Sequence, residues 1–140
     1  MYTELKQIIE KGDFQGKAEI SFTERGITIS FKEKLFFNIG SADILPNAFQ
    51  TLDEIGEVLK KQPYPIRVEG HTCDLPINTA KYPSNWELSA LRAVKVSKYL
   101  IDIVALNPEQ ISIAGYGQYR PLVPNTNETN RARNRRVDII

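Results

Sequence analysis

The hydrophobic residues of this chain change their spacing along the sequence, alternating every second residue in some segments and recurring every three or four residues in others. The first spacing is typical of a strand with one buried face, and the second of a helix with an apolar stripe. Because both occur in turn along 140 residues, we expect one α+β domain, with a mixed β-sheet and helices on one face, in the order βββαβαβ(α)β or close to it. The strand-type segments are 18–22, 27–31, 66–68, 111–113 and 137–139, and helices are predicted over 2–12, 46–61, 84–101 and near 127–134.

The helix expected from residue 84 has a strong start signal. Ser84 can cap it, and Glu87, three residues later, completes a capping box. Arg92 lies four residues after Leu88 and four before Val96, so it sits on or beside the apolar stripe. A guanidinium is costly to bury without partners. Arg92 therefore either reaches solvent along the edge of the stripe or pairs with a carboxylate.

Three residues that carry chemistry, His71, Cys73 and Asp74, follow the strand at 66–68. A metal site would need further ligands, and the chain has no other His or Cys to supply them. A Cys–His nucleophile would need an orienting group, and none is evident. Glu69 and Glu87 look structural rather than like a catalytic carboxylate pair. The sequence therefore predicts no metal, no cofactor and no enzyme activity.

Charge and hydropathy exclude further classes of function. A net charge of +1 gives no bulk attraction to nucleic acid or to an acidic membrane. A basic cluster near the C-terminus is more typical of a solvated helix end than of a nucleic-acid site, which usually has a broader basic face. No apolar run reaches the roughly 18 residues that span a bilayer, and no signal-peptide pattern follows Met1. Any export or anchoring segment of a parent protein would be missing here. The cluster comprises Arg131, Arg133, Arg135 and Arg136.

Three separated stretches share their order and spacing with a known pattern. The first runs from Leu35-Phe36-Phe37 through Gly40-Ser41-Ala42 and Leu45-Pro46 to the helix ending Ile55-Gly56-Glu57-Val58-Leu59. The second is Val68-Glu69-Gly70-His71-Thr72 followed by Asn85-Trp86-Glu87-Leu88-Ser89-Ala90-Leu91-Arg92-Ala93, and the third runs from Gly115-Tyr116-Gly117 through Arg120-Pro121 to Asn134-Arg135-Arg136-Val137. Together they resemble the OmpA-like peptidoglycan-binding domain over about residues 34–140. The resemblance implies a two-layer sandwich that binds peptidoglycan without catalysis.

Within that family the sequence is most similar to the stator B subunits of the flagellar motor, MotB and PomB, on the segment Tyr82-Pro83-Ser84-Asn85-Trp86. This resemblance implies a domain that anchors a stator unit to the cell wall, working as a homodimer with a channel-forming stator A subunit as partner. It also implies the periplasmic part of an inner-membrane protein whose transmembrane helix is absent from this chain. Residues 1–33 would then be a periplasmic linker with a regulatory role, and residues 34–140 the wall-binding domain.

The resemblance further implies how the ligand, a peptidoglycan stem peptide or the adjoining glycan, is held. A diaminopimelate end carries a carboxylate and an ammonium on one carbon, and Arg92 matches the family's arginine for the carboxylate. The family's aspartate for the ammonium is replaced by Cys73, and Asp74 is the candidate substitute. A second departure is Asn130, where a glycine is common. The implied binding residues are Thr72, Cys73, Asp74, Asn85, Leu88, Arg92, Arg131, Asn134, Arg135 and Arg136.

Two other functions fit the same sequence. The chain can be the wall-anchoring domain of another OmpA-like protein, such as an outer-membrane porin or a lipoprotein. Because Cys73 replaces the usual acid, the chain can also be a dimerisation or scaffold module with weakened wall binding. A groove closed by side chains, or one without any acid near Arg92, would favour the second of these alternatives.

Overall fold

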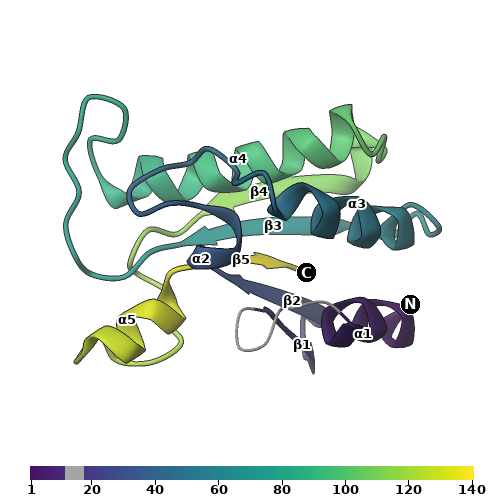
Figure 1. Cartoon of the computed structure of the whole chain (residues 1–140), viewed down its shortest axis with the longest axis horizontal. Helices are drawn as coiled ribbons and strands as arrows, with labels where there is room; N and C mark the ends of the chain where they lie inside the picture. Colours follow the sequence, from purple (N-terminus) through teal and green to yellow (C-terminus); the bar gives the residue numbers. More distant parts are fainter. Residues whose placement is uncertain (12–17) are drawn as a thin grey trace.

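The computed structural model describes residues 1–11 and 18–140 of the chain. Its elements are α1 (Tyr2–Lys11), β1 (Ala18–Thr23), β2 (Gly26–Lys32), α2 (Glu33–Phe36), α3 (Ala48–Leu59), β3 (Ile66–His71), α4 (Asn85–Asp102), the 3-10 helix η1 (Pro108–Gln110), β4 (Ile111–Gly115), α5 (Glu128–Asn134) and β5 (Arg136–Ile139). The five strands form one sheet in the order β1-β2-β5-β3-β4 (Figure 1). Only β3 and β4 pair in parallel, so the sheet is mixed, and the predicted fold class is confirmed.

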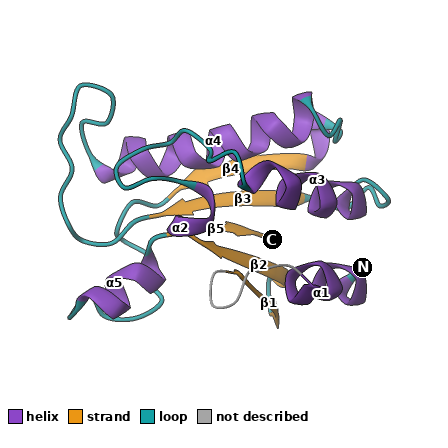
Figure 2. Cartoon of the chain, viewed as in Figure 1, coloured by secondary structure: helices purple, strands orange, loops and turns teal. Residues whose placement is uncertain are grey.

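The three longest helices, α1, α3 and α4, cover one face of the sheet (Figure 2). The core between the layers joins Leu5 of α1, Ile55 of α3 and Leu100 of α4 to Val68 and Val137 of the sheet. These side chains follow the helical and strand spacings of the sequence, which is why each element presents one apolar face to the other layer. None of the described helices is both long and apolar enough to cross a membrane.

The predicted order contained a strand too many before the helix at 46–61, and this detail is wrong. After β2 the chain makes the short helix α2, and only an isolated bridge joins Phe37 to Ile44. Phe36 and Phe37 are both buried, with exposed fractions of 0% and 2%. A strand turns neighbouring side chains to opposite faces. Two adjacent phenylalanines that enter the same core therefore require a change of backbone direction at this point.

The hairpin formed by β1 and β2 is part of the sheet. β2 pairs with β5 from Ile29↔Ile139 to Lys32↔Arg136, and its Ile29 and Phe31 are fully buried. The buried face of the predicted hairpin is less complete on β1, where Phe22 is 69% exposed. The functional division between residues 1–33 and 34–140 stays a prediction.

Helix α4 lies unusually close to strands β3 and β4. A Cβ atom added to Gly70 would lie 1.9 Å from the Ser89 carbonyl oxygen, and one added to Gly115 would lie 2.5 Å from the Ala90 nitrogen. Only glycine permits this approach. The contact places the first turn of α4, which begins at Asn85, next to the ends of both strands.

Candidate ligand-binding site

Most of the residues singled out by the sequence gather at the end of the molecule where β3 and β4 end and α4 begins. The long loop of residues 72–84 bounds this end, and α5 lies beside it (Figures 1 and 2). Ligands of α/β sheets commonly bind beyond the C-terminal ends of parallel strands, where loops diverge. The position therefore suits a binding site.

The start of α4 is fixed by the predicted capping box. The Ser84 hydroxyl accepts a hydrogen bond from the Trp86 backbone N–H at 3.2 Å and donates one to the Glu87 carboxylate. The cap satisfies a backbone donor that the first helical turn leaves free. It therefore holds the neighbouring Asn85 in a defined orientation.

Asn85 and Thr72 tie the loop to the strand ends. The Asn85 side-chain amide donates to the Leu75 carbonyl at 3.1 Å and to the Gln118 side-chain oxygen at 3.2 Å. The Thr72 backbone N–H donates to the Gly117 carbonyl at 2.9 Å. Asn85 and Thr72 are both buried, so in this arrangement they shape the loop from beneath it.

Arg92 is buried with only 1% of its surface exposed, and each of its donor nitrogens has a partner. Its Nη1 donates to the Glu33 carboxylate at 2.7 Å, its Nε to the Ser41 carbonyl at 2.8 Å, and its Nη2 to the Asn38 carbonyl at 3.2 Å. Its guanidinium also lies 4.8 Å from the centre of the Phe37 ring. Burial lowers the pKa of Arg92, and the nearby Glu33 acts against this effect. Of the two interpretations from sequence, pairing with a carboxylate is the one found.

Glu33 is the central acid of the site, although it is not among the site residues predicted from the sequence. Besides Arg92 it contacts Arg135, whose Nε lies 3.4 Å from a Glu33 carboxylate oxygen. A signal was present in the strand pattern. Ile27, Ile29 and Phe31 alternate on the inward face of β2, and the same spacing continues to position 33. An acid on a buried face requires cationic partners, so this spacing points to a buried ion pair.

Cys73 and Asp74 both meet arginines from the C-terminal part of the chain. The buried Cys73 sulfur lies 3.4 Å from Arg135 Nη1, and the other end of that guanidinium contacts the exposed Glu128. The Asp74 carboxylate pairs with Arg131 of α5 at 2.9 Å, nearer the surface. The acid that follows Cys73 is thus paired with Arg131, whereas the carboxylate bonded to Arg92 belongs to Glu33.

Two of the other predicted site residues have contacts that stabilise the surrounding structure. Leu88 is buried and packs with Ala42 and Tyr82 beneath the loop. Asn134 is fully buried, and its side-chain amide donates to the Val123 carbonyl at 2.9 Å and to the Asn125 side-chain oxygen at 2.8 Å. Both residues hold loops in place near the site.

Arg136 lies in β5 and belongs to a buried ionic cluster on the sheet. Glu69, His71 and Asp138 offer ligand atoms within 4.8 Å of one another, which is the arrangement a metal ion needs. Arginines already pair with both carboxylates, however, so the cluster is cationic without any metal. Burial lowers the pKa of His71 to about 4, and the nearby Arg136 acts in the same direction. A divalent cation would add to an existing positive charge, so the donor set does not favour one. The arginines are Arg25, Arg67 and Arg136.

An exposed aromatic pair borders the site and was not identified as functional from the sequence. Trp86 and Tyr119 are 51% and 61% exposed, and their rings stack with centroids 5.0 Å apart. Gly117 lies beneath both rings with a φ of +59°, a backbone conformation that favours glycine. The two aromatic residues lie 33 positions apart in the chain, so only the fold brings them together.

Comparison with known protein families gives one match over most of the chain. A model of the OmpA family matches residues 36–135, a range that includes Cys73, Asp74, Asn85, Arg92 and Arg131. Motility protein B of Bacillus subtilis is 32% identical over 139 residues, which is 99% of this chain and 53% of that protein. The chain spans about half the length of the first relatives it matches.

Solved structures agree with the sequence comparison. The cell wall anchor of the T6SS from Pseudomonas aeruginosa superposes with a TM-score of 0.87 at 26% identity, covering 99% of this chain and 96% of that one. The periplasmic domain of Helicobacter pylori MotB gives a TM-score of 0.79 at 31% identity, covering 87% of this chain and 79% of that one. The fold and its topology are therefore those of these domains.

Proposed function

Since this chain belongs to the OmpA family, we propose that it binds peptidoglycan without catalysing a reaction, and thereby anchors a flagellar motor stator unit to the cell wall. Support comes from the similar proteins, which include motility protein B of Bacillus subtilis and the cell wall anchor of a secretion system. The observation that carries the proposal is the convergence of Cys73, Asp74 and Asn85 with Arg131 at one end of the sheet, within the region that matches the family.

The exposed part of the site is suited to a ligand end that carries both charges. The Asp74 and Arg131 side chains are 39% and 27% exposed, and each can exchange its present partner for a ligand group of opposite charge. Arg131 would hold the carboxylate of a stem peptide, and Asp74 would hold its ammonium group. Arg92 stays the family's candidate for the carboxylate, but it reaches a ligand only if Glu33 gives up its ion pair.

A second part of the proposal concerns the location of the domain, its partners and its regulation. By analogy with the motility proteins, we place this domain in the periplasm as part of an inner-membrane protein. A second copy and a channel-forming stator A subunit would be its partners. Residues 1–33 would have a regulatory role, and Glu33 gives this role a physical route because it joins the end of the hairpin to Arg92.

Co-sedimentation with purified, insoluble peptidoglycan tests wall binding. Arg131→Gln and Asp74→Asn each remove one surface charge of the site, and we expect each to weaken binding about tenfold, the effect of losing one charge-assisted hydrogen bond. Arg133→Gln is the matched control, because Arg133 is an exposed arginine of the same helix with no ion pair among the described residues. If the wild-type protein does not sediment, or if all three variants sediment like the wild type, this assignment is wrong.

A dimerisation or scaffold module with weakened wall binding is the second candidate. The enclosure of Arg92 by Glu33, Asn38 and Ser41 favours it, as does the thiol at position 73. Analytical ultracentrifugation together with the sedimentation assay separates the two functions. A stable dimer that ignores peptidoglycan would support the scaffold, and a chain that binds peptidoglycan would exclude it.

A further inference from the structure

Trp86 and Tyr119 form an aromatic platform on the surface beside the candidate ligand-binding site. Trp86 lies in the first turn of α4 and Tyr119 in the loop after β4, and their ring planes differ by only 23°. Each ring covers one face of the other, yet the two side chains are 51% and 61% exposed. A ring that is stacked on one side and still more than half exposed has its other face open to solvent. The platform is therefore an apolar surface that the fold itself does not use.

The backbone beneath the platform is fixed from two sides. The Gly117 N–H donates to the buried Ser89 hydroxyl of α4 at 2.9 Å, and the Gly117 carbonyl accepts from the Thr72 N–H at the end of β3 at 2.9 Å. The two rings thus rest on a turn that is tied to a helix and to a strand. A contact surface held in this way loses little conformational entropy when a ligand binds to it.

The platform is continuous with the rest of the site through Asn85. The Asn85 amide that donates to the Leu75 carbonyl of the long loop also donates to the side-chain oxygen of Gln118, which is next to Tyr119. Within residues 1–11 and 18–140, the Gln118 side-chain nitrogen, the Trp86 indole N–H and the Tyr119 hydroxyl have no hydrogen-bond partner. The apolar rings are therefore bordered by polar groups that are free to bond a ligand.

We propose that the platform binds a sugar ring of the glycan in peptidoglycan, an inference that rests on the proposed function. A β-1,4-linked amino sugar carries its hydroxyl and N-acetyl groups around the edge of the ring and its C–H groups on the two faces. A face of this kind packs on an aromatic ring, and the polar edge meets the surrounding amide and hydroxyl groups. Tyr119 is the more exposed ring and provides the contact face, and Trp86 supports it from behind.

The size of the platform fits a sugar better than a protein partner. Aromatic side chains bury about 150–250 Å² each, so the exposed half of the two rings offers roughly 200 Å². A stable protein interface takes about 800 Å² from each partner. The residues next to the two rings in the sequence are all polar or charged, so the apolar surface does not extend along either segment. These neighbours are Asn85, Glu87, Gln118 and Arg120.

Titration with chitotetraose tests the proposal, because this soluble oligomer of N-acetylglucosamine has the sugar rings without a stem peptide. Trp86 is the only tryptophan of the chain, so its fluorescence reports on the platform directly. We expect a saturable change in its emission that sorbitol, a polyol without a ring, does not produce. Tyr119→Ala should raise the chitotetraose Kd about tenfold, by analogy with the loss of an aromatic side chain that stacks on a nucleobase. Tyr119→Phe keeps the ring and should raise the Kd less.

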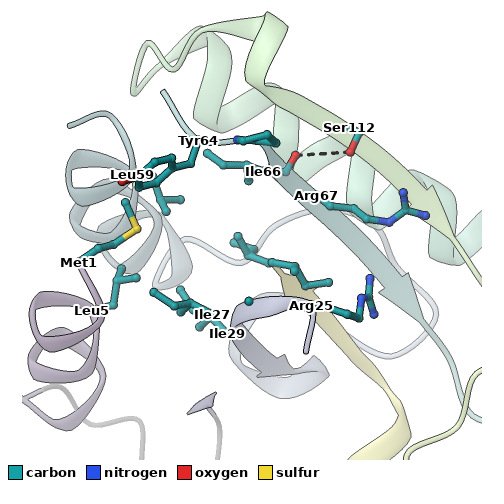
Figure 3. A pocket seen from close by; sticks show the side chains of 14 residues that line it. Met1, Leu5, Arg25, Ile27, Ile29, Leu59, Tyr64, Ile66, Arg67 and Ser112 are labelled. Carbon is teal, nitrogen blue, oxygen red and sulfur yellow. Dashed lines mark hydrogen bonds between the residues drawn. The ribbon is translucent and has the colours of Figure 1, made fainter. Parts of the chain in front are cut away.

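Tyr64→Ala is the matched control. Tyr64 is 57% exposed and precedes β3, where it lines a cavity at the end of the strand away from the platform (Figure 3). Its loss should leave the chitotetraose Kd unchanged. Backbone NMR of the wild-type protein keeps the proposal testable if a variant does not fold. Chitotetraose should then shift the amide signals of Gly117 and Gln118 and leave that of Tyr64 unchanged.

Three results would overturn the proposal. They are the absence of a saturable change with chitotetraose, an unchanged Kd in Tyr119→Ala, and a loss of self-association in Tyr119→Ala without a change in sugar binding, which would make the platform a contact between copies. Sedimentation with peptidoglycan separates this inference from the proposed function. A chain that sediments with peptidoglycan but ignores chitotetraose has wall binding without the sugar site, and a chain that binds only chitotetraose has a sugar site without wall binding.

Discussion

A guanidinium that is removed from water needs a partner for each donor group, and Arg92 has three: one carboxylate and two carbonyls. Its place beside the apolar stripe of α4 was predictable, because helical spacing is a local property. The identity of its partner was not predictable by the same means. Glu33 lies 59 positions away in the sequence. Only the fold, which packs α4 against β3 and β4 and joins β2 to the same sheet through β5, brings the two together. Local patterns thus locate a buried charge, and the fold determines what neutralises it.

Replacing Glu33 with glutamine should lower the free energy of unfolding by about 3 kcal/mol, because Arg92 is left as a buried charge without a counter-ion. Glu128→Gln is the matched control. Glu128 pairs with Arg135, the second arginine that Glu33 contacts, but it is 67% exposed, so its loss should lower the stability much less than the loss of Glu33. Chemical denaturation measures both. Equal losses in the two variants would contradict a buried structural pair.

His71 should make stability depend on pH. Its pKa is about 4 in the folded protein against 6.5 when unfolded, because burial and Arg136 disfavour the charged ring more than Glu69 and Asp138 favour it. The unfolded chain therefore takes up a proton first as the pH falls below 6.5. Between pH 7 and pH 5 the free energy of unfolding should fall by about 2 kcal/mol from this residue. His71→Gln should remove that fall, and an unchanged slope in this variant would assign it to other groups.

At the scale of the elements, most of the architecture could be predicted. The start of α4 at Ser84, the strands at Ile66 and Ile111 and the final strand all follow from spacing and capping, which depend on near neighbours. The short helix at 33–36 could not be predicted, because its turn places Phe36 and Phe37 in one core, and that packing depends on the tertiary structure.

The contact between α4 and the sheet should be highly sensitive to one added methyl group. In Gly70→Ala the new carbon would lie 1.9 Å from the Ser89 backbone oxygen, so the whole helix must move away from β3. We expect a loss of about 3 kcal/mol or more in the free energy of unfolding. Gly26→Ala is a useful comparison, because its Cβ meets no atom within 4 Å and only its positive φ of +109° causes strain. A smaller loss at Gly70 than at Gly26 would show that the layers tolerate separation.

At the scale of the whole molecule, the functional boundary predicted from the sequence does not coincide with a break in the sheet. The predicted boundary between residues 33 and 34 separates β2 from β5, which are hydrogen-bonded neighbours in the middle of the sheet. It also separates Glu33 from Arg92 and Arg135. Residues 1–33 can still have a regulatory role, but the last of them belong to the same sheet as residues 34–140. A change in the hairpin would therefore be transmitted directly to the candidate site.

Two fragments test where the folding unit begins. A fragment of residues 26–140 keeps β2 and Glu33 and should unfold cooperatively, with a lower Tm than the full chain. A fragment of residues 34–140 loses Ile29 and Phe31, two fully buried side chains worth about 1.5–3 kcal/mol each, and leaves Arg92 unpaired. Because a domain of this size is stable by only about 5–15 kcal/mol, these losses together approach its whole stability.

We therefore expect the 34–140 fragment to show no cooperative thermal transition by circular dichroism, while the 26–140 fragment does. Equal Tm values for the two fragments would mean that β2 is dispensable and that the boundary lies after residue 33. Failure of both would move the start of the folding unit back to β1 or α1, whose Leu5 and Ile9 enter the same core. Each outcome places the boundary at a different element, because the three possible starting points differ in which buried side chains they retain.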